Sequence, residues 1–248
     1  MSKQVTLERN VESLDWRPGE HPLPASLVTP AESIRRYAQP AANSLFPLEY
    51  AFHLLSGLPG KTVVDLGCGV GLNTAILAAL GARVLSIDAS EANLVQTARR
   101  ARANGVSRQV ELVRWETGPL PVADASADHV LCSGICGQAN PVTAARQIRR
   151  ILKPGGTAIF EAPSIRSPLL EAIHKCREEY APSRLGALTT AEIDAISRAV
   201  GFAGRRRDFC LIPRLLPRET ILEAALARYL RFTHRFASLV VWEARKES

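Results

Sequence analysis

The segment VVDLGCGVGLNTAILAALGARVLSIDAS, from Val63 to Ser90, limits the possible folds more than any other part of the chain. A short apolar run is followed by glycines at alternate positions, Gly67, Gly69 and Gly71, and then by residues with helical periodicity. Glycines in such a turn let backbone N–H groups approach a ligand at the start of a helix. The pattern predicts a strand, a ligand-binding loop and a helix in succession.

Alternating strand and helix patterns continue through the rest of the chain. Strands are predicted at residues 61–67, 83–89, 109–115, 127–133, 156–162, 205–213 and 236–245, and helices at 72–82, 90–106, 141–156 and 189–202. Strands and helices that alternate at these lengths form a parallel sheet with helices on both faces. The prediction is an α/β fold: a Rossmann-like, doubly wound, seven-stranded, mostly parallel sheet.

Two regions are expected to lie outside this alternation. Residues 1–60 are interpreted as an N-terminal arm and helical lid: the arm is rich in proline and polar residues, and two short helices follow, broken at Pro40 and Pro47. Residues 61–248 are interpreted as the main domain, with helical insertions at about 162–188 and 213–234. The insertions come near strand ends, where they are expected to cover a pocket.

Composition narrows the classes of partner and compartment. The net charge is +7, but the arginines are spread along helices without interleaved aromatic residues, which favours solvated helix faces over a nucleic-acid groove. Five scattered cysteines do not indicate a disulfide framework, and Cys132 and Cys136 lack a nearby second pair that would complete a zinc site. No apolar run reaches the roughly 18 residues of a membrane span. We expect a cytoplasmic protein without a metal or a membrane span.

The charge beside the loop indicates which ligand it holds. A dinucleotide fingerprint requires a glycine at the position of Leu72, so the loop does not fit that motif. Asp65 lies two residues before the first glycine. A carboxylate is unfavourable beside a pyrophosphate and favourable beside a cationic amine.

The motifs then resemble, in order, those of the class I S-adenosylmethionine-dependent methyltransferases. VVDLGCGVGLNT resembles the family's first motif and VLSIDAS its second. VRWETGPLPVADASADHVLCSG and RQIRRILKPGG are similar to its later strand and helix segments. The resemblance covers Lys61 to Glu161 well and Thr189 to Gly201 fairly. It implies S-adenosylmethionine as cofactor, released as S-adenosylhomocysteine.

Carried over by position, the resemblance implies a set of cofactor contacts. Those for the methionine part are Asp65, Gly67, Cys68 and Gly69; for the ribose and adenine, Asp88 and Ala89; for the adenine edge, Trp115 or Glu116; and for the sulfonium end, Ser133 and Gly134. The chain departs from the family in having Trp115-Glu116 where Gly-Asp is common. It also has Ala127 where Phe is usual, which leaves the adenine contacts least defined. Asp128 is expected to be structural.

Three residues are candidates for the acceptor pocket. Tyr37 is expected to close the pocket or to pack between helices, Glu161 to face the acceptor or to cap a loop, and His174 to act as a base or to lie on a helix surface. Cys136 is expected to be a pocket wall, because no partner that would activate its thiol is evident. His129, inside a strand, is expected to be structural.

The predicted function is methyl transfer to O, N or C of a small-molecule acceptor, such as a secondary metabolite, by in-line displacement. One alternative is methylation of RNA or protein, which the net charge favours. The CSGICG segment after the fourth strand lacks the motif used for exocyclic amines of nucleic-acid bases, so nucleic acid is the less favoured partner. Another alternative is a cofactor-binding protein that transfers no methyl group. We expect a monomer or homodimer.

Overall fold

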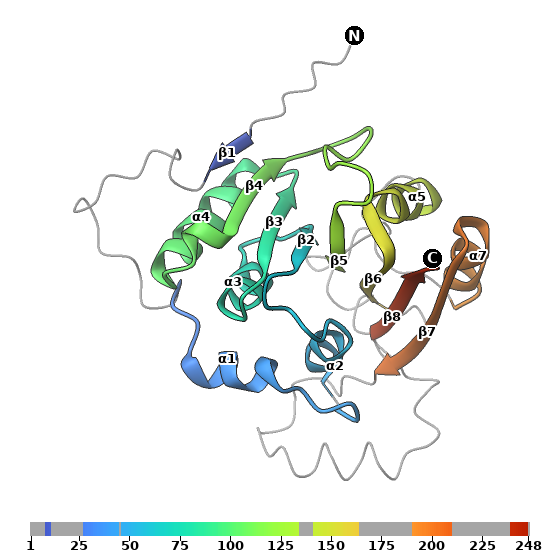
Figure 1. The fold of residues 1–248 in the computed structure, drawn as a ribbon, viewed down its shortest axis with the longest axis horizontal. Helices are drawn as coiled ribbons and strands as arrows, with labels where there is room; N and C mark the ends of the chain where they lie inside the picture. The colour runs from blue at the N-terminus through green and yellow to red at the C-terminus, as the bar shows by residue number, and fades with distance from the viewer. Residues whose placement is uncertain are drawn as a thin grey trace, which may run out of the picture.

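The computed structural model describes residues 8–10, 27–44, 46–133, 141–163, 190–209 and 239–247. In chain order the elements are β1 (Glu8–Asn10), α1 (Ala31–Ala38), α2 (Pro47–Leu54), β2 (Thr62–Leu66), α3 (Leu72–Ala79), β3 (Arg83–Asp88), α4 (Glu91–Ala103), the 3-10 turn Ser107–Gln109, β4 (Val110–Arg114), β5 (Ala127–Ser133), α5 (Pro141–Ile151), β6 (Leu152–Pro163), α7 (Thr190–Val200), β7 (Phe202–Phe209) and β8 (Leu239–Lys246) (Figure 1).

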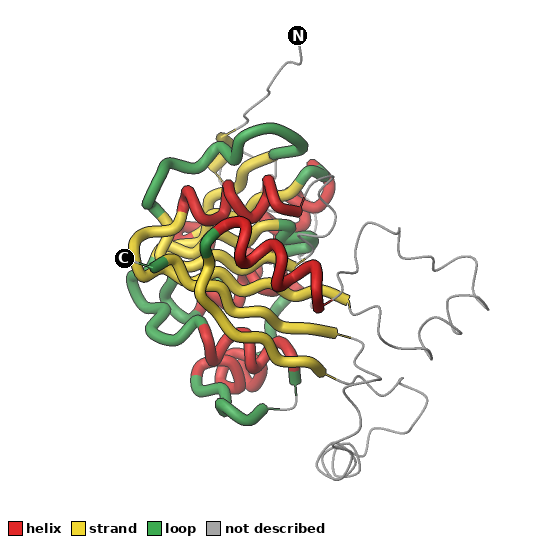
Figure 2. The backbone as a smooth tube through the Cα atoms, turned by 90° about the vertical axis from the view of Figure 1, so that its right-hand side faces the viewer, coloured by secondary structure: helices red, strands yellow, loops and turns green. Residues whose placement is uncertain are grey.

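All described strands lie in one sheet, in the order β1-β4-β3-β2-β5-β6-β8-β7. The strands from β4 to β6 are parallel, and β8 is antiparallel to both of its neighbours. Figure 2, drawn from the side of β7, shows them as one continuous layer. The prediction of a doubly wound, mostly parallel sheet of seven strands is confirmed, and the short strand β1 adds an eighth at one edge.

The order of the strands also places the site. From β2 the chain moves to β3 and β4 on one side, and then returns to β5 and β6 on the other. The change of direction lies between β2 and β5, which pair through Asp65 and Leu131. Ligands of open α/β sheets bind beyond the carboxyl ends of the strands at such a point. The loop after β2 lies at this position.

Helices cover both faces of the sheet, because alternate strand residues are apolar on each side. On one face, Val63, Val84, Leu131 and Ile159 pack with α2, α3 and α4 in one core cluster. On the other, the strands pack with α5 and α7 in a second cluster, which includes the stacked rings of Phe160 and Trp242. The side chains of β2 and β6 that share a face with Val63 and Ile159 therefore point towards α2–α4.

The two short N-terminal helices are present as predicted, on either side of the Pro40 turn. The rings of Tyr37 in α1 and Phe52 in α2 lie 4.9 Å apart, and Arg36 forms an ion pair with Glu49. Figure 1 shows both helices together, away from α5 and α7. α2 is anchored in the core by its buried residues, whereas α1 has no buried residue.

Some boundaries differ from the predictions, among them the start of β7 at Phe202, three residues before the strand predicted at 205–213. The N-terminal arm was not expected to contribute to the sheet, yet Glu8–Asn10 pairs antiparallel with β4, because backbone pairing at a sheet edge does not require apolar side chains. β6 begins at Leu152, before the Pro-Gly-Gly turn that was expected to end the preceding helix, and the register with β5 shifts there. Of the helical insertions predicted at about 162–188 and 213–234, residues 162–163 belong to β6 and the rest lie outside the described residues.

Candidate functional site

The glycine loop connects β2 to α3 by backbone contacts that its three glycines permit. Gly67, Gly69 and Gly71 have φ of 78°, 54° and 77°, in the left-handed region that other residues adopt at a cost. The N–H groups of Gly67 and Cys68 donate to the Ile87 carbonyl at 2.8 and 3.1 Å. The loop is therefore fixed to the end of β3.

The glycines at 69 and 71 serve different purposes. A Cβ at Gly71 would lie 2.7 Å from Thr97 Cγ2 and 2.9 Å from Thr97 Cα, so α4 leaves no room for a side chain there. A Cβ at Gly69 would meet nothing within 4 Å among the described residues. Gly71 allows close packing of the loop on α4, whereas the space beside Gly69 is open among the described residues.

Asp65 is a fully buried carboxylate with one free oxygen. Its Oδ2 accepts a hydrogen bond of 2.6 Å from Thr74 Oγ1, but Oδ1 has no hydrogen-bond partner among the described residues. Burial raises the pKa of Asp65 to about 6, and the nearby charges of Glu161 and Asp88 act in the same direction. A buried anion with an unpaired oxygen is costly unless a cation or donor reaches it. The geometry suits a bound ammonium group.

Asp88 organises the turn at the end of β3. Its Oδ2 accepts from Gly69 N at 2.9 Å, and its Oδ1 accepts from Ser90 N at 2.8 Å and Asn93 Nδ2 at 3.1 Å. Ser90, not Asp88, is the N-cap of α4, since its hydroxyl accepts from Asn93 N. Because a carboxylate has about four acceptor positions, Asp88 retains capacity for one further donor.

Trp115 and Glu116 follow β4 beside Asp88. Trp115 N donates to the Asp88 carbonyl at 3.1 Å, and its indole donates to the Pro119 carbonyl. Glu116 pairs instead with Arg114, and its side chain is 60% exposed. Of the two residues expected at the adenine edge, Trp115 is the one fixed to the Asp88 turn. Ala89 is exposed, and its carbonyl accepts from Arg114.

Glu161 lies on the same side of the sheet as Asp65, and its charge acts on both Asp65 and Tyr37. Glu161 pairs in register with Ser133 at the carboxyl end of β6 and shares a face with Ile159. Its charge raises the pKa of both Asp65 and Tyr37, so it lies within electrostatic range of each. Burial is the larger cause of the raised Tyr37 pKa. The structure thus places Glu161 within electrostatic range of Asp65 and of Tyr37; His174 lies outside the described residues, as do Gly134 and Cys136.

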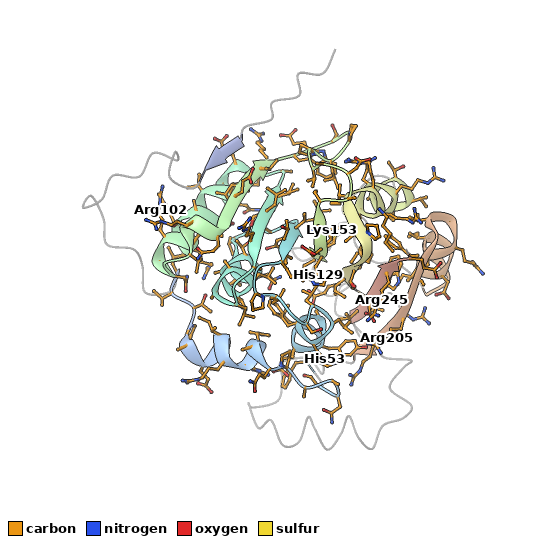
Figure 3. The ribbon with its side chains drawn as sticks, viewed as in Figure 1. His53, Arg102, His129, Lys153, Arg205 and Arg245 are labelled. Carbon is orange, nitrogen blue, oxygen red and sulfur yellow. The ribbon has the colours of Figure 1, made fainter. Side chains whose placement is uncertain are left out.

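Asp128 and His129 are at the opposite ends of these strands. The Asp128 carboxylate accepts from Thr62 N, Lys153 and Lys61; although burial opposes the shift, these donors lower its pKa to about 2. Figure 3 shows His129 near Lys153, and burial lowers the pKa of this histidine. The expectation that Asp128 is structural agrees with these contacts, whereas the buried Nδ1 of His129 has no hydrogen-bond partner among the described residues.

Within the described residues, thiol chemistry and metal binding find little support. Cys68 and Cys132 are buried and form no disulfide, and burial raises the pKa of Cys68 well above its usual range. No group of three potential metal ligands occurs within the described residues. None of the helices described is long and apolar enough to cross a membrane.

Sequence comparison identifies the domain that contains these residues. Residues 64–160 match the family model described as "Methyltransferase domain". The chain is 33% identical over 117 residues to a ubiquinone biosynthesis O-methyltransferase from Alkalilimnicola ehrlichii, covering 46% of each protein. The chain spans between 32% and 51% of the length of the first curated relatives that it matches.

Solved structures show the same fold. A putative S-adenosylmethionine-dependent methyltransferase from Listeria monocytogenes superposes with a TM-score of 0.61 at 18% identity, over 82% of this chain and 97% of that one. The [4+2]-cyclase SpnF has a TM-score of 0.57 at 20% identity, over 87% of this chain and 80% of that one. A protein named as a cyclase and one named as a putative methyltransferase share this fold. The function must therefore be argued from the site.

Proposed function

Because this chain belongs to the class I S-adenosylmethionine-dependent methyltransferase family, we propose that it transfers a methyl group from S-adenosylmethionine to an O, N or C atom of a small-molecule acceptor. The observation that carries the proposal is the unpaired Oδ1 of Asp65, which is buried near the end of β2, two residues before the first glycine of the loop. An amino acid joined to a nucleoside, with a cationic end, satisfies that oxygen, whereas a pyrophosphate would be repelled.

The residues fit this cofactor along the whole loop. Asp65 would hold the ammonium group, the backbone at Gly67 and Gly69 would contact the methionine part, and Asp88 would accept from a ribose hydroxyl. Ala89 follows Asp88 in the chain, and Trp115 N donates a hydrogen bond to the Asp88 carbonyl. Both residues would contact the adenine there. Ser133 and Gly134 follow the strand paired with β2 and remain the proposed residues near the sulfonium.

The bound cofactor supplies an activated methyl group attached to sulfur. The protein's contribution is alignment and exclusion of water, which in oriented pairs lowers a barrier by about 7 kcal/mol or more. Glu161 would face the acceptor, because its charge acts on Asp65 at the cofactor end of the site. Tyr37 would join it there, because the charge of Glu161 also acts on Tyr37. Glu161 would accept a hydrogen bond from an acceptor hydroxyl or amine and take its proton where transfer requires one.

A small acceptor is favoured by the helices over the site. α1 and α2 pack together on the sheet face to which Asp65 and Glu161 point, and the charge of Glu161 acts on Tyr37 in α1. Small acceptors need an enclosed pocket with a few polar groups. The matched O-methyltransferase of ubiquinone biosynthesis supports this acceptor class.

The proposal is tested with S-adenosylmethionine labelled on its methyl group, offered with phenols, quinols, amines and carbon acids, and separately with RNA and with protein. Transfer to a small molecule, absent in Asp65→Asn, is expected. Transfer to RNA or protein alone would overturn the acceptor class. Binding of the cofactor without transfer to any acceptor would overturn the activity.

Asp88→Ala is expected to weaken binding of S-adenosylhomocysteine by about 1–3 kcal/mol, through loss of charge-assisted hydrogen bonds. Calorimetry measures this, with Glu91→Ala as the control, because Glu91 is an exposed acid that pairs with Arg114. An affinity equal to that of the control would remove Asp88 from the site.

A further inference from the structure

We propose that Arg100 is a positioning residue that ties the glycine loop to the N-terminal segment, so that cofactor binding at the loop sets the place of α1 and Tyr37. The proposal rests on the proposed function, because it assigns a consequence to cofactor binding at this loop. Neither the sequence motifs nor the cofactor contacts include Arg100.

Arg100 joins two carbonyls that are distant in the chain. It lies on α4 and is only 8% exposed. Its Nε donates to the Val70 carbonyl in the glycine loop at 2.9 Å, and its Nη1 donates to the Leu27 carbonyl in the N-terminal segment at 3.3 Å. The planar guanidinium presents several donors in a fixed arrangement, which a lysine cannot reproduce. One side chain thus orients both segments.

Asn104, at the end of α4, holds the same segment in place. Its Nδ2 donates to the Leu27 carbonyl at 2.9 Å, and its Oδ1 accepts from Thr29 N at 2.7 Å. Leu27 and Thr29 are each 8% exposed. Because α1 begins at Ala31, directly after this segment, the contacts with Arg100 and Asn104 fix where α1 starts.

α1 has few contacts of its own that would fix its position. None of its residues is buried; it contacts α3, and it rests on α2 through the Tyr37 and Phe52 rings and the pair of Arg36 with Glu49. Most helical stability in proteins comes from packing, so the position of a helix without a buried residue depends on the segments at its two ends. The tether at its start therefore affects where Tyr37 lies relative to Glu161.

The loop side of the tether adjoins the cofactor contact. Val70 follows Gly69, whose N–H is held by Asp88 and whose carbonyl lies 2.9 Å from Thr97 Oγ1. A ligand that orders Gly69 also orders the Val70 carbonyl, and through Arg100 it restrains Leu27. Two segments ordered by one event are thermodynamically coupled, and the coupling is reciprocal.

Hydrogen exchange measured by mass spectrometry tests the coupling, with and without S-adenosylhomocysteine at a concentration that saturates each variant. In the wild type, the ligand is expected to slow exchange in both the loop at 66–72 and the segment at 27–38. In Arg100→Met, the loop is expected to stay protected while protection of 27–38 is lost, and calorimetry should show binding about tenfold weaker. Arg100→Lys should restore protection only in part.

Two further variants separate positioning from general destabilisation. Arg99→Met removes the same charge from an exposed neighbour on α4 and should behave as the wild type. Asn104→Ala should reduce protection of 27–38 with little change in affinity, and it replaces Arg100→Met if that variant does not fold. The proposal is overturned if Arg100→Met retains protection of 27–38. The same holds for Asn104→Ala where that variant replaces Arg100→Met. A wild type that binds the ligand without any change in this segment also overturns the proposal. A wild type that does not bind the ligand at all instead overturns the proposed function.

Discussion

Asp65→Asn is expected to weaken binding of S-adenosylmethionine and S-adenosylhomocysteine at least a hundredfold while it makes the unliganded protein more stable. Removing one partner of a buried ion pair costs about 3–5 kcal/mol, so the loss of affinity follows if the ammonium group meets this carboxylate. The asparagine oxygen can still accept from Thr74, which preserves the local packing. Without ligand, the substitution removes a buried charge whose second oxygen is unpaired.

The gain in stability has a defined dependence on pH. Because the pKa of Asp65 is raised in the folded protein from 3.8 to about 6, the folded state retains the proton when the unfolded chain has lost it. Stability therefore falls as the pH rises from about 4 to about 6, by about 3 kcal/mol in total. Thermal unfolding should show Asp65→Asn more stable than the wild type at pH 8, with a smaller difference below pH 6.

An exposed acid provides the control for this substitution. Asp124→Asn changes a carboxylate whose side chain is 75% exposed and which pairs with Arg150. It should alter neither cofactor affinity nor the pH dependence of unfolding. If Asp65→Asn changed the cofactor affinity and the pH dependence of unfolding as little as Asp124→Asn, Asp65 could not be the carboxylate that binds the cofactor.

Substitution of the two loop glycines is expected to separate folding from binding. Gly71→Ala should yield little folded protein, because its Cβ would overlap the backbone and side chain of Thr97 and its φ of 77° is unfavourable for alanine by about 1–2 kcal/mol. Gly69→Ala should fold, with a loss limited to a similar backbone term, because nothing in the described structure occupies the space at its Cβ. Its methyl group would instead displace the cofactor.

The measurements are the yield of soluble folded protein, thermal unfolding and titration with S-adenosylhomocysteine. Gly57→Ala is a suitable control, since Gly57 has a similar φ of 78° and open surroundings but lies before β2, outside the proposed site. Gly69→Ala and Gly57→Ala should have similar stability and very different affinity. Equal affinity in both would show that the open space at Gly69 is not part of the site.

Much of the fold could be predicted, because its signals are local. Strand β2 is almost wholly buried and reads as a continuous apolar run, and Ser90 caps α4 as its position in the sequence indicated. The glycine loop was evident from its spacing. Asp65 could be proposed because its charge lies near the end of β2, two residues before the glycine loop, and Asp88 because it ends β3, where the family resemblance implies the ribose contact.

Other features depend on contacts between distant segments and left no local signal. The pairing of Glu8–Asn10 with β4 and the tether from Arg100 to Leu27 join residues that no periodicity relates. The unpaired oxygen of Asp65 could not be predicted either, since it follows from burial and from the single hydrogen bond with Thr74. The electrostatic proximity of Glu161 to Asp65 required the register of β5 and β6.

Calorimetric titration with S-adenosylhomocysteine at pH 6, repeated in buffers of different ionisation enthalpy, tests most directly whether an ionised Asp65 receives the cationic end of the cofactor. Since the pKa of Asp65 is about 6 without ligand, binding should release about half a proton in the wild type and none in Asp65→Asn. Affinity of the wild type should also rise with pH through this range. Binding without proton release, or equal release in Asp65→Asn, would contradict the assignment of this carboxylate to the cofactor.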